Sequence, residues 1–234
     1  MDPELVSYQL EGCIENEELQ VKPSFFLVFQ YITFHFLWEN GDMTNQPSPA
    51  TLALMIRGSA PLLLRFLRGF DESNRTLQRP EMPNHPIWIL GHTAFTMARF
   101  GHLAGGPVPN EKDFAPEDGS DGAQNSAKRF RADDVMKDST PVGDPDFYPS
   151  LVRGQEIFSR AIEELACVLE SLPTERLQET VLWNGDPLRI DALAIRLCFH
   201  NGLHAGQLTD LRRGAGFDRV LPTSPVAAKQ SRPS

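Results

Sequence analysis

The 234-residue sequence has few cysteines: Cys13, Cys167 and Cys198 are odd in number, widely spaced and free of any Cys-x-x-Cys pair. This set excludes a disulfide framework and a cysteine-based zinc or redox motif. It is typical of a reducing compartment, so we expect a cytoplasmic protein. The sequence also lacks a phosphate-binding P-loop, a Gly-x-Gly-x-x-Gly turn and a Gly-x-Ser-x-Gly elbow. Their absence argues against the nucleotide-binding and serine-hydrolase sites that depend on these motifs.

Basic residues are in the minority, with 22 Lys and Arg against 31 Asp and Glu and a net charge of −9. An acidic chain lacks the positive field that concentrates phosphate backbones, so we expect no nucleic-acid partner. The charge is uneven, because residues 1–42 hold eight acidic residues and a single base, Lys22, and so contribute −7. The remainder is close to neutral, so its charge says little about partners, but it shows neither a basic face nor a known nucleic-acid-binding motif. The partner that we expect is a small-molecule substrate.

No hydrophobic run reaches the roughly 18 residues of a membrane helix. The longest run, residues 25–38, is interrupted by Gln30 and His35, follows an acidic region and precedes no small-residue cleavage site, so neither a membrane span nor a signal peptide is expected. The run is consistent with an extra core strand or helix. Regular patterning begins only after Met43, however, and we favour the hypothesis that Met43 is the biological initiator. Residues 1–42 would then precede the native protein, and residues 1–46 form an N-terminal extension before the bundle.

Helical periodicity predicts four helices after this extension, followed by a disordered tail at 223–234. Start and stop signals bound them: Ser48-Pro49 and Asn84-His85-Pro86 open the first two, and Gly214 is the expected C-cap of the last. Pro61 is expected to kink or divide the first helix. The four predicted helices cover residues 48–70, 84–104, 150–172 and 191–213. A long loop, 107–149, separates the second helix from the third, and a short extended piece with an Asn-Gly turn, 181–188, precedes the fourth. The pattern indicates an all-α four-helix bundle over 47–222.

Of the six histidines, His200 and His204 are the most informative, because a spacing of four places them about 6 Å apart on one helix face. Two imidazoles so placed can converge on one metal ion, although they could also be unrelated residues of a polar face. The surrounding helix is apolar, which favours the metal site. His92, flanked by Trp88 and Phe95 on the second helix, is the candidate third ligand.

Other polar residues near this pattern have secondary roles. Gln207, one turn beyond His204, could reach the metal or support a ligand. Asn201 stands where zinc peptidases carry a glutamate base, and it cannot take a proton, so a peptidase mechanism is not expected. His85 is expected to start its helix, His102 to be solvated and Cys198 to be a small core residue.

These residues resemble the DinB/YfiT-like superfamily of metal-binding four-helix bundles over about residues 47–222. The resemblance rests on the stretch Asn84-His85-Pro86-Ile87-Trp88-Ile89-Leu90-Gly91-His92 and on His200-x-x-x-His204-x-Gly-Gln207-Leu, followed by Leu211-Arg212-Arg213-Gly214. It implies that His92, His200 and His204 hold a divalent ion. The family includes thiol transferases that use bacillithiol and enzymes that depend on mycothiol.

We therefore expect a metal-dependent thiol transferase or hydrolase with zinc as the favoured ion and nickel or iron as alternatives, since all three accept imidazole. A low-molecular-weight thiol would be activated by the ion and would attack an electrophile beneath the 107–149 loop, between apolar walls from Trp88 and Phe95. Asn201 and Gln207 would lie around the metal ligands or line the pocket beside them. The alternative is a non-catalytic, metal-binding stress-response bundle, and a homodimer formed through a helix face is compatible with it.

Overall fold

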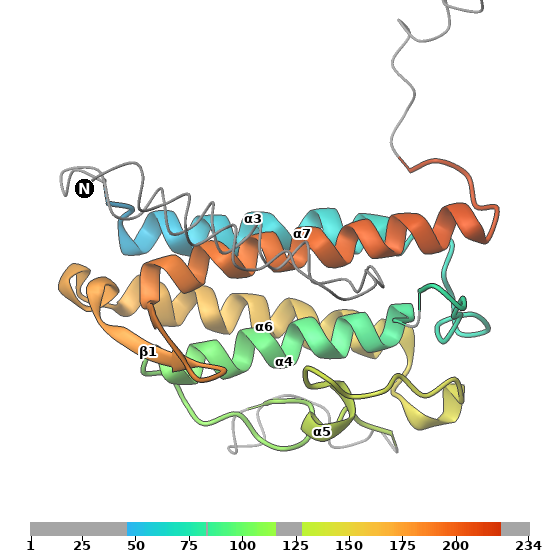
Figure 1. Ribbon diagram of the computed structural model, residues 1–234, viewed down its shortest axis with the longest axis horizontal. Helices are drawn as coiled ribbons and strands as arrows, with labels where there is room; N and C mark the ends of the chain where they lie inside the picture. The colour runs from blue at the N-terminus through green and yellow to red at the C-terminus, as the bar shows by residue number, and fades with distance from the viewer. Residues whose placement is uncertain (1–45, 83, 116–127, 221–234) are drawn as a thin grey trace, which may run out of the picture. The chain divides into compact units, whose positions relative to one another are not determined.

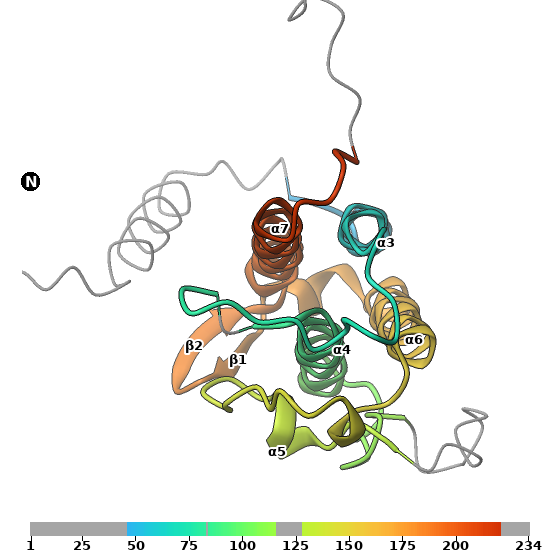
Figure 2. The same ribbon diagram turned by 90° about the vertical axis from the view of Figure 1, so that its right-hand side faces the viewer.

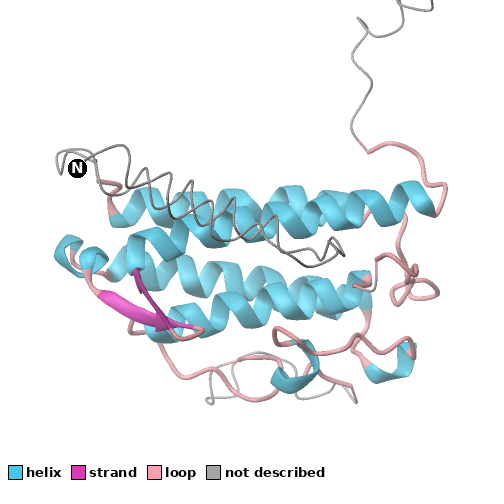
Figure 3. Cartoon of the chain, viewed as in Figure 1, coloured by secondary structure: helices cyan, strands magenta, loops and turns pink. Residues whose placement is uncertain are grey.

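The computed structural model describes residues 46–82, 84–115 and 128–220. The proposed extension up to residue 45 and the tail at 223–234 lie outside these ranges. The described elements, in chain order, are α3 (Pro49–Phe66), α4 (Pro86–Leu103), α5 (Ala132–Val135), the 3-10 helix η3 (Pro145–Phe147), α6 (Leu151–Ser171), the 3-10 helix η4 (Thr174–Gln178), β1 (Thr180–Trp183), β2 (Asp186–Arg189) and α7 (Ile190–Gly214). Figures 1 and 3 show the predominance of helix, which confirms the predicted all-α class.

The four long helices form a bundle whose end-on arrangement is seen in Figure 2. Contacts between helices are extensive for α4 with α6, α6 with α3, and α3 with α7, whereas α4 and α7 touch each other sparsely. The short helix α5 lies against the outer side of α4. The core between the long helices is built from fully buried side chains such as Leu52, Ile56, Leu63, Ile87, Met97, Phe100, Ile157, Phe158, Leu193 and Leu208.

The predicted helix starts agree with the structure. The Ser48 hydroxyl accepts a hydrogen bond from the Thr51 amide at the start of α3, and Ser150 caps α6 in the same way. At α4 the N-cap residue is His85, whose Nδ1 accepts from the Trp88 amide, so this histidine is a helix-start residue as expected.

The predicted division of the first helix at Pro61 and the predicted C-cap at Gly214 are both wrong. The helix α3 continues through Pro61 without a break. Pro61 removes one backbone hydrogen bond, but the buried stripe of α3 on both sides of it stays packed against the core. At the other end of the chain, Gly214 is the last residue of α7, and the glycine with left-handed φ is Gly216, at 76°. An added Cβ at Gly214 would lie 2.6 Å from Nε of Arg79, so close approach explains this glycine.

The strands β1 and β2 form an antiparallel hairpin with Trp183 opposite Asp186. Its two turn residues, Asn184 and Gly185, have φ values of 54° and 91°, which is the type I′ turn that an Asn-Gly pair predicts. The hairpin leads directly into α7 at one end of the bundle (Figure 1). None of the described helices combines the length and hydrophobicity that a membrane span requires.

Candidate metal centre

The sparse α4–α7 side of the bundle holds a cluster of three imidazoles. His92 comes from α4, and His200 and His204 come from successive turns of α7. One nitrogen from each ring lies within 4.8 Å of the others, so the three residues could hold a metal ion together. The Nε2 atom of His200 is 3.1 Å from Nε2 of His92 and 3.1 Å from Nε2 of His204. The structure therefore brings together the three histidines that the sequence singled out.

The outer nitrogens determine which atoms face the centre. His92 Nδ1 is 2.7 Å from the backbone oxygen of Val135, and His204 Nδ1 is 2.9 Å from Oε1 of Gln207. Both oxygens only accept hydrogen bonds, so each Nδ1 carries the proton and each Nε2 presents a lone pair inward. The proton of a neutral His200 can satisfy at most one of these two lone pairs.

This arrangement fits a cation. The three Nε2 atoms share at most one proton, that of His200, so at least two of their lone pairs face each other and repel. A cation bound between the three nitrogens would remove that repulsion. His200 Nδ1 is also buried and has no hydrogen-bond partner in the described part of the chain. The donor set is three nitrogens, which suits zinc and other imidazole-binding transition metals.

Burial keeps the imidazoles neutral. Desolvation lowers the pKa of His92, which the Val135 carbonyl partly offsets. Burial lowers the pKa of His204 to about 3, with a smaller contribution from His92. The pKa of His200 is well below its ordinary value because of burial first, and then because of the charges of His204, His92 and Arg196. Neutral imidazole is the form that binds metal, so the site is prepared for a cation at neutral pH.

The connection between α4 and α6 orients the α4 side of the centre. Trp88 stacks on His92 with ring centroids 4.6 Å apart and an angle of 8° between planes. Its indole Nε1 donates to the Asp134 carbonyl and to the Ser139 hydroxyl, and Val135, which binds His92, lies between those two residues. Sequence reasoning missed Val135, because a backbone carbonyl of an irregular segment leaves no side-chain signal.

The other residues expected near the centre have separate positions. Gln207 contacts His204 and also accepts from the Asn84 amide at 3.4 Å. Phe95 packs its ring on Phe114 at 5.2 Å. Asn201 is fully buried and its amide donates to the Ser59 hydroxyl of α3.

The remaining candidates stand apart from the three histidines. His102 is exposed, as expected, with Nδ1 3.3 Å from the Gly106 carbonyl. The Cys198 thiol bonds to the Ala194 carbonyl within its own helix. Burial raises its pKa to about 11, so it is a poor nucleophile at neutral pH.

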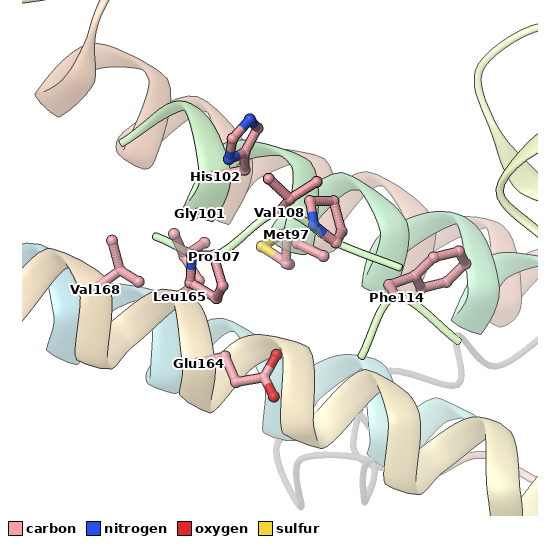
Figure 4. A pocket seen from close by; sticks show the side chains of 11 residues that line it. Met97, Gly101, His102, Pro107, Val108, Phe114, Glu164, Leu165 and Val168 are labelled. Carbon is pink, nitrogen blue, oxygen red and sulfur yellow. The ribbon is translucent and has the colours of Figure 1, made fainter. Parts of the chain in front are cut away.

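A pocket beneath the start of the long connection lies away from this cluster. It is lined by side chains of α4, α6 and residues 107–114, including Met97, Val108, Phe114 and Leu165 (Figure 4). None of the three histidines lines it. Its polar residue on α4, His102, follows His92 by ten residues, or about 15 Å of helix. This pocket thus does not provide the expected space next to the histidines, because it opens between α4 and α6 rather than between α4 and α7.

Comparison with known families agrees with this architecture. The family model described as DinB superfamily matches residues 55–208, a range that contains all three histidines. No curated protein and no solved structure matches the chain. The family match spans well over half of the sequence and includes the parts of α4 and α7 that carry the three histidines. The chain belongs to the DinB superfamily.

Proposed function

We propose that this protein is a divalent-metal-dependent enzyme that activates a small thiol in an S-transferase reaction, or water in a hydrolysis. The supporting observation is the inward placement of Nε2 lone pairs from His92 and His204, whose outer nitrogens are held by neutral oxygens. No further His, Cys, Asp or Glu in the described ranges joins this group. Three protein ligands with a remaining open position are typical of catalytic rather than structural zinc sites.

Each residue of the centre has a distinct task in this proposal. His92, His200 and His204 would bind the ion, with zinc favoured and nickel or iron as alternatives. Once bound, the ion would lower the pKa of a thiol or water beside it, so that the nucleophile forms at neutral pH. Trp88 keeps the His92 ring in place by stacking, and Gln207 keeps His204 in the tautomer that binds metal.

Metal analysis of the purified protein tests the first part of the proposal. Wild type is expected to retain about one divalent ion per chain, and His204→Ala is expected to lose it together with the thermal stability that the ion confers. His102→Ala is the control, since this histidine is on α4 but exposed, and it should retain the metal. An unchanged metal content in His204→Ala contradicts the three-histidine site.

Turnover assays test the second part. Metal-loaded protein is given several low-molecular-weight thiols with an electrophilic acceptor, and ester substrates for hydrolysis. Turnover that disappears on chelation and returns with metal supports an enzyme. The second candidate is a non-catalytic, metal-binding stress-response bundle. The burial of the centre favours it, because only 4% of His204 and 8% of His92 is exposed. Metal binding without turnover for any thiol or ester supports that candidate.

A further inference from the structure

Two arginines flank the histidine cluster on the side of the β1–β2 hairpin. Arg196 precedes His200 by one turn of α7, about 6 Å along the helix. Arg99 follows His92 by about 10 Å along α4, which also runs toward the hairpin, where Arg99 bonds to Oδ1 of Asn184 at 2.8 Å. Its guanidinium also lies 4.6 Å from the ring of Trp183. The two cations therefore border the same end of the α4–α7 side.

Neither arginine has an acidic partner within the described ranges. Arg99 contacts a neutral amide and an indole. Arg196 is half-buried and forms no hydrogen bond or ion pair with a described residue. Other arginines of α7 and its N-cap behave differently, since Arg189 pairs with Asp191 and Arg213 with Asp210. A half-buried guanidinium without a partner is unfavourable and is typical of a site that receives an anion.

The electrostatics of the centre point the same way. Arg196 lies four residues before His200, so the two side chains leave the same face of α7. The groups that hold the outer nitrogens of His92 and His204 are a carbonyl and an amide oxygen, and no carboxylate belongs to the group. A divalent ion held by these three neutral histidines would keep its full positive charge, so a negatively charged ligand would be favoured there.

We propose that Arg196, assisted by Arg99, binds an oxyanion of the substrate, a carboxylate or a phosphate, while another group of the same molecule reaches the histidine cluster. This inference rests on the proposed function and specifies its substrate class: a thiol or ester that is itself an anion. A guanidinium supplies a planar pair of donors that matches either oxyanion.

The test uses full-length protein loaded with Co²⁺, whose absorption spectrum reports a thiol that joins the ion. The probes are 3-mercaptopropionate and its amide, which have the same shape and differ in charge. Wild type is expected to bind the carboxylate at least about tenfold more tightly than the amide. Arg196→Gln should remove this preference and Arg196→Lys should keep part of it. Arg213→Gln, an exposed arginine on the same helix, should leave it unchanged. Inorganic phosphate and acetate, compared as competitors, distinguish the two oxyanions.

The possible results separate the anion site from the metal site. Equal affinity for the two probes in wild type, or a preference that survives in folded Arg196→Gln, overturns the anion site and leaves the metal site standing. Failure of Co²⁺ to bind overturns the proposed function instead. In that case calorimetric titration of metal-free protein with the same probes still tests the arginines. Carboxylate binding that depends on Arg196 supports the site, and its absence overturns it.

Discussion

Gln207 and Val135 show how the imidazoles are controlled by groups that do not bind metal themselves. Gln207 Oε1 holds His204 Nδ1 at 2.9 Å and receives a second donor from Asn84. Gln207→Ala removes the acceptor, so His204 can adopt the other tautomer and rotate. We expect the affinity for zinc to fall by about 10- to 100-fold, measured by competition with a chelator. Thr209→Ala, whose hydroxyl bonds only to its own helix at Ala205, should bind zinc as wild type does.

His85 couples stability to pH without belonging to the metal centre. Burial lowers its pKa to about 4, and the hydrogen bond that Nε2 donates to the Val142 carbonyl offsets this effect only in part. Its Nδ1 accepts from the Trp88 amide. The unfolded chain takes up a proton near pH 6.5 that the folded His85 does not accept. The contribution of neutral His85 to the free energy of unfolding is therefore fully present above about pH 6.5 and is lost as the pH falls toward 4.

Urea unfolding of metal-free protein measures this contribution. Between pH 7 and pH 5, wild type should lose about 2 kcal/mol more stability than His85→Asn, which keeps a capping oxygen but does not titrate in this range. The metal-centre histidines contribute equally to both proteins, so the difference isolates His85. Parallel loss in the two proteins would contradict this assignment.

At the scale of elements, the contact between α4 and the connection containing α5 determines the position of the Val135 carbonyl. A Cβ added at Gly91 would lie 2.7 Å from ring carbons of Phe130 and 2.8 Å from Cγ1 of Val135. Gly91→Ala should therefore push α5 away from α4. We expect a loss of about 1–3 kcal/mol in stability and weaker metal binding, since the acceptor of His92 moves as well.

Gly58→Ala is the matched control for this contact. Gly58 lies in α3, and an added Cβ there meets nothing within 4 Å. Because alanine favours helix over glycine, Gly58→Ala should gain about 0.5–1 kcal/mol and keep the metal affinity of wild type. Thermal unfolding and zinc titration of both variants check the pair. A Gly91→Ala protein with wild-type metal affinity would show that the α4–α5 contact does not govern His92.

At the scale of the whole molecule, α3 and α7 expose apolar side chains on neighbouring outer faces: Met55 and Leu62 on α3, Phe199 and Leu203 on α7. Monomeric proteins rarely expose extended apolar surface. Gly58 and Gly202 lie between these residues and Gly206 follows Leu203, and an added Cβ at any of the three glycines would meet nothing within 4 Å. These seven residues carry no charge, so a second copy related by a two-fold axis would meet no like charge there. We expect a homodimer through this face.

Light scattering coupled to gel filtration measures this association. Wild type should have the mass of a dimer, and Phe199→Glu should be monomeric, because it places like charges opposite each other in a two-fold interface. Leu182→Glu is the control, since Leu182 on β1 is 67% exposed, about as much as Phe199 at 61%, and lies on the hairpin. A monomeric wild type, or an unchanged dimer in Phe199→Glu, is the result that rules out this face.

The amino-acid sequence alone was sufficient for the long helices, their starts and the three histidines. Apolar spacing, the cap at Ser48 and the His200–His204 interval are local patterns, and local patterns act within a few residues along the chain. The Asn184-Gly185 turn was predictable for the same reason, since its backbone angles depend on those two residues.

Only the tertiary structure decided how the histidines are held and what surrounds them. The Val135 carbonyl reaches His92 across 43 positions of sequence, and Asn201 turns toward Ser59 because α7 packs on α3. Helix α3 continues through Pro61 because packing outweighs one lost hydrogen bond. Arg99 lies toward the same end of the bundle as the start of α7, which carries Arg196, because α4 and α7 run in opposite directions. These features depend on contacts between distant segments, which periodicity and capping signals do not encode.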